Sequence, residues 1–491
     1  MLFPSNHSSD FEVHRNWMAI VYNKPIGEWY IENTSIWTLD YPIFFAYFEW
    51  ILARLASLFD EKILTLSSEP YYSTNTLIFQ RISVLVMELL FLIPPIQIIN
   101  HSQKNYDPNS QYNSLLFTVF NASLILVDNI HFQYNCFLIG ILLFAILYSN
   151  EHPRISAVIF TFLVFTKHYF LVIAPIWFVY LIHTCYYDSK GSIKNFIYSS
   201  MVILIIVVTV STIAIFPLLK TNQIFHFFRR LFPVSRGFIH FIPASNIYSI
   251  YATLDKILPR FIPKICSTSI TDPNGHYIKS MRCLPPISPY FCIVICLAMN
   301  IPILIRLFRN LTRGDRHVSI LASSSLSLLI SFLFGYHIHE KQIIYATVPL
   351  GVYTYIFSKD EKFNNYYLLL NNWANISMMV LHEEYPENII KYIIVLVYYY
   401  AQFIFLKSNS KKYNYHHSFL MLSLISIFII EFIVQKIVLG NTKFLFVYHL
   451  ASSLICFFPI AFYSSSLYYL WITGKVEISE TGENTMKYKK L

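Results

Sequence analysis

The sequence alternates between long apolar runs and short polar segments along most of its length. Many of the apolar runs are about 17–22 residues long, the length an α-helix needs to cross a hydrocarbon core of about 30 Å. Backbone groups in lipid must be satisfied within their own segment, so we predict helices rather than strands. The fold class is therefore all-α, a polytopic membrane protein with about 13 transmembrane helices. The predicted spans lie at approximately 82–99, 114–127, 136–149, 155–166, 168–186, 196–218, 288–306, 318–336, 342–357, 365–381, 390–406, 418–436 and 444–472.

The composition supports this class. The 491 residues are 55% hydrophobic and only 13% charged, against about 25% charged residues in soluble proteins. The formal net charge of +9 would suggest nucleic acid as the partner of a soluble domain. In a membrane protein it indicates lysine and arginine held in cytoplasmic loops, so we predict the lipid bilayer as a partner and no nucleic acid.

Positive charge is concentrated in alternate loops. If the spans alternate from a lumenal start, the cytoplasmic loops and tail contain Lys104, Arg154, Lys190, Lys194, Arg306, Arg309, Arg313, Arg316, Lys359, Lys362, Lys407, Lys411 and Lys412. This distribution agrees with the positive-inside rule and predicts a cytoplasmic C-terminus. Lys487 and Lys489 in that tail resemble a dilysine signal for retrieval to the endoplasmic reticulum, although a basic tail without a signal is the alternative.

The same pattern predicts five parts of the chain. These are a first lumenal loop with interfacial helices (1–81), an N-terminal transmembrane module (82–218), a large lumenal loop (219–287), a C-terminal transmembrane module (288–472) and a cytoplasmic tail (473–491). Within the first part, Ile43 to Phe59 is apolar but contains Glu49 and Arg54. We predict that it lies in the membrane interface, with a short spanning helix as the alternative.

One carboxylate stands at the boundary between polar and apolar sequence. Asp40 follows an aromatic run and precedes Tyr41-Pro42 and an apolar segment. Proline restrains Tyr41 to an extended conformation, so the acid is expected on a turn entering a helix. A partly desolvated carboxylate there can act as a base, but it can equally be a loop acid or a helix N-cap with no chemical role.

Further polar clusters interrupt the apolar sequence on the predicted lumenal side. Residues 128–135 form a short turn whose polar side chains are costly at membrane depth unless they face water or a partner, which predicts a cavity wall. Lys167-His168 either separates two spans or places a cation beside an anionic headgroup. Arginines in 229–236 oppose the positive-inside rule, so they either bind phosphate or are solvated loop charges.

We predict no metal site. The 128–135 turn has one Asp and one His, which are too few ligands, and His337 and His339 lack the spacing of the HExxH motif. The seven cysteines form no metal-type pattern. Cys266 and Cys283 share the large lumenal loop, which leaves a disulfide between them open.

Six blocks of the sequence, in order, resemble the dolichyl-phosphate-glucose-dependent α-1,3-glucosyltransferases of asparagine-linked glycosylation. The blocks are DFEVHRNWMAI (10–20), ENTSIWTLDYP (32–42), HFQYN (131–135), KHYFLVIAP (167–175), RLFPVSRG (230–237) and FLFGYHIHEK (332–341). The resemblance implies a GT-C-type membrane fold in the endoplasmic reticulum with its active site in the lumen. It implies inverting transfer from dolichyl phosphate β-D-glucose to a dolichyl-diphosphate-linked oligosaccharide, with no metal and no cofactor.

The resemblance also implies roles for individual residues. Asp40 aligns with the proposed general base. The implied donor-binding residues are Lys167, His168, Arg236, His339, Glu340 and Lys341. The implied cavity wall is Asp128, His131, Gln133 and Asn135, and the implied acceptor loop contains Glu32, Trp37 and Tyr41.

Two sister enzymes share this pattern, one adding the first glucose to a mannose and the other adding a second glucose to the first. FEVHRNW and GYHIHEK resemble the second-glucose enzyme, and the first-glucose enzyme remains the alternative. A non-catalytic lipid transporter is a more distant alternative, since no internal repeat is evident. The sequence departs from the family pattern in three places. No apolar helix precedes Asp10, Ile43 replaces the second proline after Asp40, and Asn129 and Cys136 replace a His and a Gly.

Overall fold

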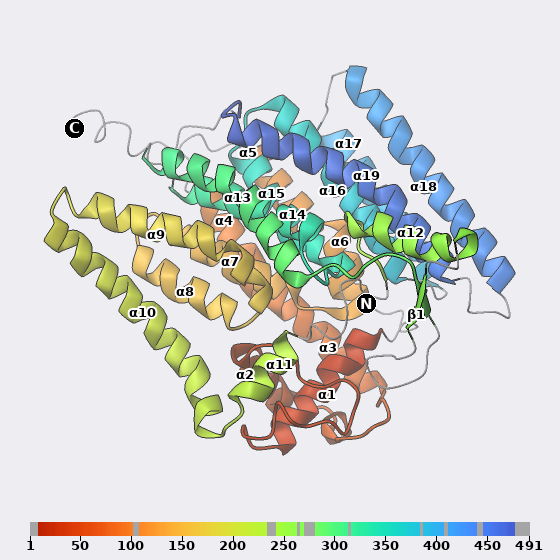
Figure 1. Cartoon of the computed structure of the whole chain (residues 1–491), viewed down its shortest axis with the longest axis horizontal. Coiled ribbons are helices and arrows are strands. Elements are labelled where there is room, and N and C mark those ends of the chain that lie inside the picture. Colours follow the sequence, from red (N-terminus) through yellow and green to blue (C-terminus); the bar gives the residue numbers. More distant parts are fainter. Residues whose placement is uncertain are drawn as a thin grey trace.

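The computed structural model describes residues 8–101, 108–232, 242–262, 266–269, 280–312, 316–382, 386–406, 411–438 and 445–476. In these residues the chain is helical apart from one two-stranded antiparallel pair, as Figure 1 shows. The predicted all-α polytopic fold is confirmed.

The elements of the N-terminal half run as far as α12. They are α1 (Ser9–Asn23), α2 (Ile43–Ala56), η1 (Glu61–Leu64), α3 (Thr74–Met87), η2 (Glu88–Leu92), α4 (Ile93–His101), α5 (Pro108–Val119), α6 (Ala122–Leu124), η3 (Ile125–Phe132), α7 (Asn135–Leu147), α8 (Pro153–Val164), η4 (His168–Ile173), α9 (Ala174–Asp188), α10 (Ile193–Lys220), α11 (Ile224–Leu231) and α12 (Tyr248–Phe261).

The C-terminal half begins with the strand pair. Its elements are β1 (Ser267–Ser269), β2 (Ser280–Arg282), α13 (Pro289–Leu311), α14 (Arg316–Phe334), η6 (Glu340–Ile343), α15 (Ile344–Ile356), α16 (Glu361–Ser377), η7 (Met378–Leu381), α17 (Glu387–Leu406), α18 (Lys411–Val438) and α19 (Leu445–Ile472).

Seven helices among the described residues are long and apolar enough to cross a membrane by length and composition. They are Thr74–His101, Asn113–Phe132, His168–Asp188, Ile193–Lys220, Pro289–Leu311, Arg316–Phe334 and Val447–Ile472. The other predicted spans correspond to α7, α8, α15, α16, α17 and α18. Of these, α7 and α15 are buried along almost their whole length, as expected of apolar helices enclosed by their neighbours.

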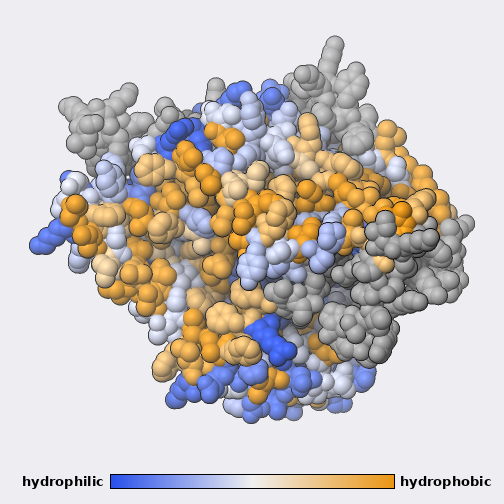
Figure 2. All heavy atoms as spheres, viewed as in Figure 1, coloured by the Kyte–Doolittle hydropathy of each residue, from blue (hydrophilic) through white to orange (hydrophobic). Residues whose placement is uncertain are grey.

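The outer surface of the bundle is apolar. Ile193–Lys220 and Pro289–Leu311 are mostly exposed, and their exposed side chains are large and hydrophobic. Figure 2 shows a broad hydrophobic band across this face, with hydrophilic residues below it and along the upper edge. A contiguous apolar surface of this kind is stable against lipid and costly against water, so the band marks the membrane-facing side.

A compact unit built from residues 8–70 lies at the lower edge of the bundle. Figure 1 places α1, α2 and α11 together there, and the rings of Tyr30 and Phe227 lie 5.0 Å apart. Ser8 caps α1 by accepting a hydrogen bond from the Phe11 amide, and two acidic residues in the first turn favour the positive end of the helix dipole. Although α1 is rich in polar residues, most of it is buried.

Side-chain amides connect the two transmembrane modules inside the bundle. Asn121 Nδ2 donates to Asn371 Oδ1 at 2.9 Å, and Asn371 Nδ2 donates to the Tyr398 hydroxyl at 3.0 Å. The Ser123 amide donates to Asn375 Oδ1 at 3.0 Å. Because polar groups in the bundle interior must find partners there, these bonds define how α6 packs against α16 and α17.

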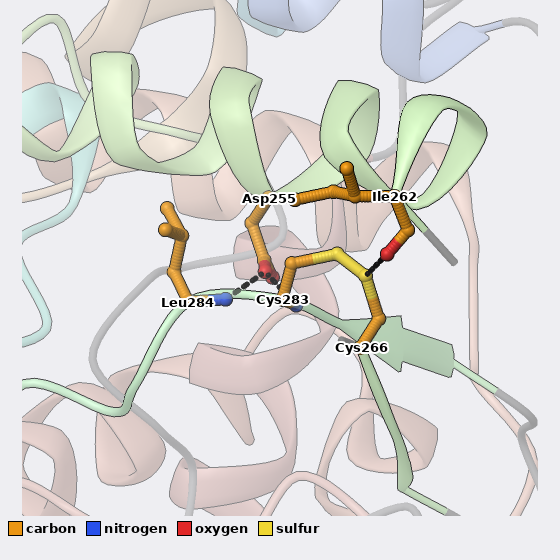
Figure 3. Close-up of a disulfide and its surroundings, with 5 residues drawn as sticks. All are labelled: Asp255, Ile262, Cys266, Cys283 and Leu284. Atoms are coloured by element: carbon orange, nitrogen blue, oxygen red, sulfur yellow. Dashed lines mark hydrogen bonds between the residues drawn. A yellow bond between two sulfur atoms is a disulfide. The ribbon is translucent and has the colours of Figure 1, made fainter. Parts of the chain in front are cut away.

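The loop between α12 and α13 contains a disulfide between Cys266 and Cys283, drawn in Figure 3. The Asp255 carboxylate of α12 accepts hydrogen bonds from the amides of Cys283 and Leu284 at 2.9 and 3.1 Å. The disulfide joins the start of β1 to the end of β2, and the Asp255 hydrogen bonds attach this pair to α12. Disulfides persist in oxidising compartments, so this pair is consistent with a loop on the lumenal side.

Candidate active site

The DFEVHRNW block holds the first loop in place through its polar side chains. Arg15 makes a two-point contact with the Glu12 carboxylate, at 2.8 Å from Nε and 2.6 Å from NH2. Its NH1 also donates to the carbonyls of Ile63 and Thr65, both at 2.9 Å. His14 contacts Glu49 of α2 at 2.6 Å. Bidentate guanidinium contacts are geometrically specific, so α1, α2 and the chain after η1 form one rigid unit.

The next two residues of the block position the segment that carries Asp40. Asn16 Nδ2 donates to the Trp37 carbonyl at 2.8 Å, and Trp17 Nε1 donates to the Thr38 carbonyl at 3.1 Å. On the other side of Asp40, the Tyr30 hydroxyl donates to the Tyr41 carbonyl at 2.8 Å. Asp40 itself is half-buried. Its backbone is thus held from both sides by side chains of α1 and the first loop.

Tyr41 and Lys167 bring the first loop to the boundary between α8 and η4. The Phe44 amide donates to the Phe165 carbonyl at 3.0 Å, which aligns the start of α2 with the end of α8. Lys167 Nζ donates to the Tyr41 hydroxyl and lies 4.3 Å from the centroid of its ring. The predicted break at Lys167-His168 is confirmed, because α8 ends at Val164 and η4 begins at His168.

The pKa of Lys167 depends on its burial and on the charges around it. Burial, together with the nearby Lys341 ammonium, lowers the pKa of Lys167 to about 7. The carboxylates of Asp10, Asp40 and Asp128 oppose that change. A lysine with a pKa of about 7 carries its positive charge over only part of the physiological pH range, which is typical of functional sites.

A second carboxylate, which the sequence analysis did not single out, lies at the centre of the polar cluster. Asp10 of α1 forms an ion pair with Lys341, and its Oδ2 lies 3.0 Å from His131 Nε2. The Ser8 hydroxyl donates to the His131 carbonyl, so the same turn of α1 also fixes the backbone of η3. Three of the six sequence blocks therefore meet at one carboxylate.

The charges in this cluster stabilise one another. Burial acts to raise the pKa of Asp10, but the Lys341 ammonium and His131 hold it well below its usual value. Burial acts to lower the pKa of Lys341, and the Asp10 carboxylate raises it above its usual value. Asp10 is thus a carboxylate at every physiological pH, and Lys341 is an ammonium.

The predicted cavity wall forms part of the same region, with one correction. Asp128 and His131 were predicted in a turn, but they lie in η3, a π-helical extension of the preceding span. Asp128 accepts hydrogen bonds from Asn135 Nδ2 and from the Cys136 amide, both at 2.6 Å, and so caps the start of α7. The cap satisfies the Cys136 amide in the first turn of α7, just after η3 ends at Phe132. At the turn Phe132 has a φ of 82°, a strained value for this residue.

Asn135 connects the wall to Lys167. Its Oδ1 accepts a hydrogen bond from the Tyr345 hydroxyl, and the Tyr345 ring lies 5.3 Å from Lys167 Nζ. Gln133 is buried beside the turn. Asn135 therefore contacts the site through Tyr345. Both carboxylate oxygens of Asp128 accept hydrogen bonds at the start of α7.

The remaining predicted residues lie around this centre. Arg230 NH2 donates to the Glu32 carbonyl at 2.9 Å, and Lys24 contacts the Glu32 carboxylate at 3.5 Å. His168 packs against the Phe232 ring at 5.2 Å. The ring of His339 lies 5.5 Å from that of His337, and Glu340 is buried. Arg236 lies outside the described residues, where its predicted contact with phosphate stays a prediction.

Among the described residues, no group of three or more His, Cys, Asp and Glu side chains is arranged to hold a metal ion. The acidic and basic side chains of the centre are Asp10, Asp40, Lys167, Lys341 and His131, and Asp128 lies in its wall. Carboxylates can accept a proton, and lysines can bind a phosphate.

A polytopic helical bundle with a polar site closed by its first loop is an architecture of membrane-embedded transferases. The chain belongs to the ALG6, ALG8 glycosyltransferase family, whose profile matches residues 1–468. It is therefore a multi-pass membrane glycosyltransferase, and the helical fold is consistent with the GT-C type.

Curated relatives extend over most of the chain. It is 33% identical to a mouse protein over 98% of this chain and 94% of the relative. It is 37% identical to a fission yeast (Schizosaccharomyces pombe) protein over 72% of each chain, and 34% identical to an Arabidopsis thaliana protein over 81% of this chain and 78% of the relative. Each of these relatives is named dolichyl pyrophosphate Glc1Man9GlcNAc2 alpha-1,3-glucosyltransferase.

Proposed function

We propose that the chain transfers glucose from dolichyl phosphate β-D-glucose to a monoglucosylated, dolichyl-diphosphate-linked oligosaccharide. The product is an α-1,3 linkage that carries the second glucose. The names of the relatives support this acceptor, because each contains one glucose on the oligosaccharide before transfer. The observation that carries the proposal is the meeting of Asp10, Lys341 and His131, from three family blocks, at one buried site.

The proposed chemistry is a single inverting displacement. A carboxylate removes the proton from the acceptor 3-hydroxyl while that oxygen bonds to the anomeric carbon, and dolichyl phosphate leaves from the opposite face of the sugar. The leaving group, a phosphate monoester, needs no general acid, so one carboxylate suffices, unlike in a glycosidase. Lys167 and Lys341 stabilise the negative charge that develops on the departing phosphate.

Two carboxylates compete for the role of base. The resemblance favours Asp40, and Asp10 is a second candidate because it contacts Lys341 and His131 directly. A donor phosphate bound to Lys341 competes with Asp10 for the ammonium. The weakened ion pair then raises the pKa of Asp10 and makes it a stronger base. We therefore propose Asp10 as the base and Asp40 as a charge that keeps Lys167 protonated.

Asp10→Asn and Asp40→Asn variants separate these roles. Loss of the base is expected to lower kcat by about 10²–10⁴-fold with donor binding retained, and loss of a supporting charge to act mainly on the KM for the donor. Single-turnover transfer and donor binding are measured for both variants. Near-normal kcat in Asp10→Asn, with the large loss in Asp40→Asn, would return the role of base to Asp40.

An in vitro assay with two defined acceptors tests the acceptor. Purified protein receives dolichyl phosphate glucose with either an unglucosylated or a monoglucosylated lipid-linked oligosaccharide. We expect product only from the monoglucosylated acceptor. Product from the unglucosylated acceptor alone would assign the chain to the first-glucose reaction. Full activity in the presence of a chelator is expected, and loss of activity restored by a divalent ion would contradict a metal-free mechanism.

We also propose that the enzyme resides in the endoplasmic reticulum membrane, with the site in the lumen and the C-terminus in the cytoplasm. The disulfide in the 219–287 loop and the basic residues of the opposite loops support this orientation. Arg306, in the last two turns of α13, lies against Gly474 just after the end of α19. The basic cluster and the end of the last helix are thus on the same side.

A further inference from the structure

Three buried imidazole nitrogens gather where the C-terminal helices meet η3. His382 follows η7 and is fully buried, and neither of its ring nitrogens makes a hydrogen bond within the described part of the chain. The Nδ1 of His131 is also buried and has no partner there. The two rings are nearly perpendicular, with centroids 6.0 Å apart. Buried polar atoms without partners are rare and costly, so such a group indicates a place where a ligand or water supplies the missing bonds.

These nitrogens lie next to the site of Asp10. The other nitrogen of His131, Nε2, lies 3.0 Å from Asp10. The Leu126 carbonyl lies near the His382 ring but does not meet hydrogen-bond geometry with it. Burial, with the nearby charges of His131 and Lys391, lowers the pKa of His382 well below its usual value, so the ring is neutral. A neutral imidazole offers one donor and one acceptor, as does the hydroxyl group of a sugar.

The backbone at His382 is held by a charged network deep in the C-terminal helices. Lys391 is fully buried, and its Nζ donates to the His382 carbonyl at 2.6 Å and to Glu431 at 2.6 Å. Glu431 also accepts a hydrogen bond from the Tyr392 hydroxyl at 2.5 Å. The Tyr448 hydroxyl lies 3.3 Å from Lys391 Nζ. Side chains of α18 and α19 thus hold the Lys391 ammonium, which bonds the His382 carbonyl and so positions the backbone that carries the imidazole.

We propose that His382, together with His131, binds a hydroxyl group of a hexose in the transfer site, and that Lys391 is the positioning residue for His382. The inference rests on the proposed function, since the hexose is one of the two sugars that meet beside Asp10. Both the glucose of the donor and the terminal glucose of the acceptor carry suitable hydroxyls. The shared chemistry is a pyranose hydroxyl, and separate measurements with the two substrates identify its source.

The test compares His382→Leu with His382→Gln, which retains a donor and an acceptor. The control is His183→Leu on α9, because His183 is also buried with an unpartnered Nδ1 but packs against Phe308, away from the site. KM and kcat are measured for each substrate with the other saturating. Loss of one or two neutral hydrogen bonds is expected to raise one KM by about threefold to tenfold with kcat nearly unchanged. His382→Gln is expected to recover part of the loss, and His183→Leu to leave both KM values unchanged.

Binding measured without turnover separates this inference from the proposed function. Thermal stabilisation of the purified protein by dolichyl phosphate glucose, and by the monoglucosylated lipid-linked oligosaccharide, is recorded for each variant. If the wild type binds but transfers nothing, the proposed function fails, and weaker binding by His382→Leu would still support the hydroxyl contact. Unchanged binding and KM for both substrates in a folded His382→Leu protein would overturn the inference. An equal change in His183→Leu would also overturn it, because the effect would then be general to buried histidines.

The positioning role is tested by a double-mutant cycle. Lys391→Met with Glu431→Gln removes both charges, and the pair is combined with His382→Leu. If the charged pair acts through His382, the double neutral variant raises the same KM, and this increase disappears in the His382→Leu background. Additive effects in the two backgrounds would show that Lys391 serves folding alone and would overturn its positioning role.

Discussion

At the scale of single residues, the site depends on which groups are charged at neutral pH. Asp10 and Lys341 stabilise each other's charged forms, so they keep their charges across the physiological range. Lys167 differs, because burial and the Lys341 ammonium lower its pKa to about 7. Below that pH the ammonium predominates and can bind a phosphate. Above it the neutral amine predominates and cannot.

This difference predicts a pH dependence. The kcat/KM for the donor is expected to fall as the pH rises through about 7, approaching tenfold per unit, because it reports ionisation in the free enzyme. In Lys167→Arg the fall of kcat/KM for the donor is expected to move above pH 9, because a guanidinium stays charged. The profile is measured from pH 5.5 to 9. An unchanged falling limb in Lys167→Arg would assign it to another group.

At the scale of elements, α1 explains why the block DFEVHRNW matters. Its residues have two roles. Asp10 contacts Lys341 in the site, whereas Arg15, Asn16 and Trp17 bond the backbone of η1 and of the segment before Asp40. Hydropathy indicated only a polar loop there, because a helix buried by its polar contacts has no apolar stripe. The signal that could have identified α1 was its N-terminal cap, Ser8 followed by acidic residues in the first turn.

Trp17→Phe tests the role of α1 in placing Asp40. The aromatic ring keeps its packing against Tyr41, whose centroid lies 4.8 Å away, but the bond to the Thr38 carbonyl is lost. We expect a destabilisation of about 0.5–1.5 kcal/mol in thermal unfolding. Activity is expected to fall further than stability predicts, since α1 then holds the segment before Asp40 through Asn16 but no longer through Trp17. An Ile36→Val change at an exposed position of the same loop is the control.

At the scale of the whole molecule, buried polar bonds join parts of the chain that lie far apart in the sequence. The Lys391–Glu431 pair ties α17 to α18 in the interior, at 2.6 Å. Lys391→Met alone leaves Glu431 buried without its counter-charge, which is expected to cost about 3–5 kcal/mol. Lys391→Met with Glu431→Gln is expected to recover most of that loss. Thermal unfolding in detergent measures both, and equal destabilisation by the single and double variants would contradict a charge effect.

The orientation of the molecule predicts a glycosylation pattern. Asn33 lies in an Asn-Thr-Ser sequon at an exposed position of the first loop, whereas Asn310 lies in a sequon but is buried near the basic end of α13. The same predicted lumenal loop carries a second sequon at Asn6, so in microsomes we expect an endoglycosidase-sensitive glycan that Asn6→Gln with Asn33→Gln removes and Asn310→Gln does not change. A glycan on Asn310 would reverse the proposed orientation.

The sequence by itself determined the helical membrane class, the family blocks and most of the residues around the site. These depend on local properties, since apolar length and motif order can be read along the chain. Only the tertiary structure revealed the centre of the site. Asp10 and Lys341 are 331 residues apart in sequence, and His382 lies in no block. Their contacts arise from packing of helices with no shared periodicity, so no local pattern distinguishes these residues from other polar positions.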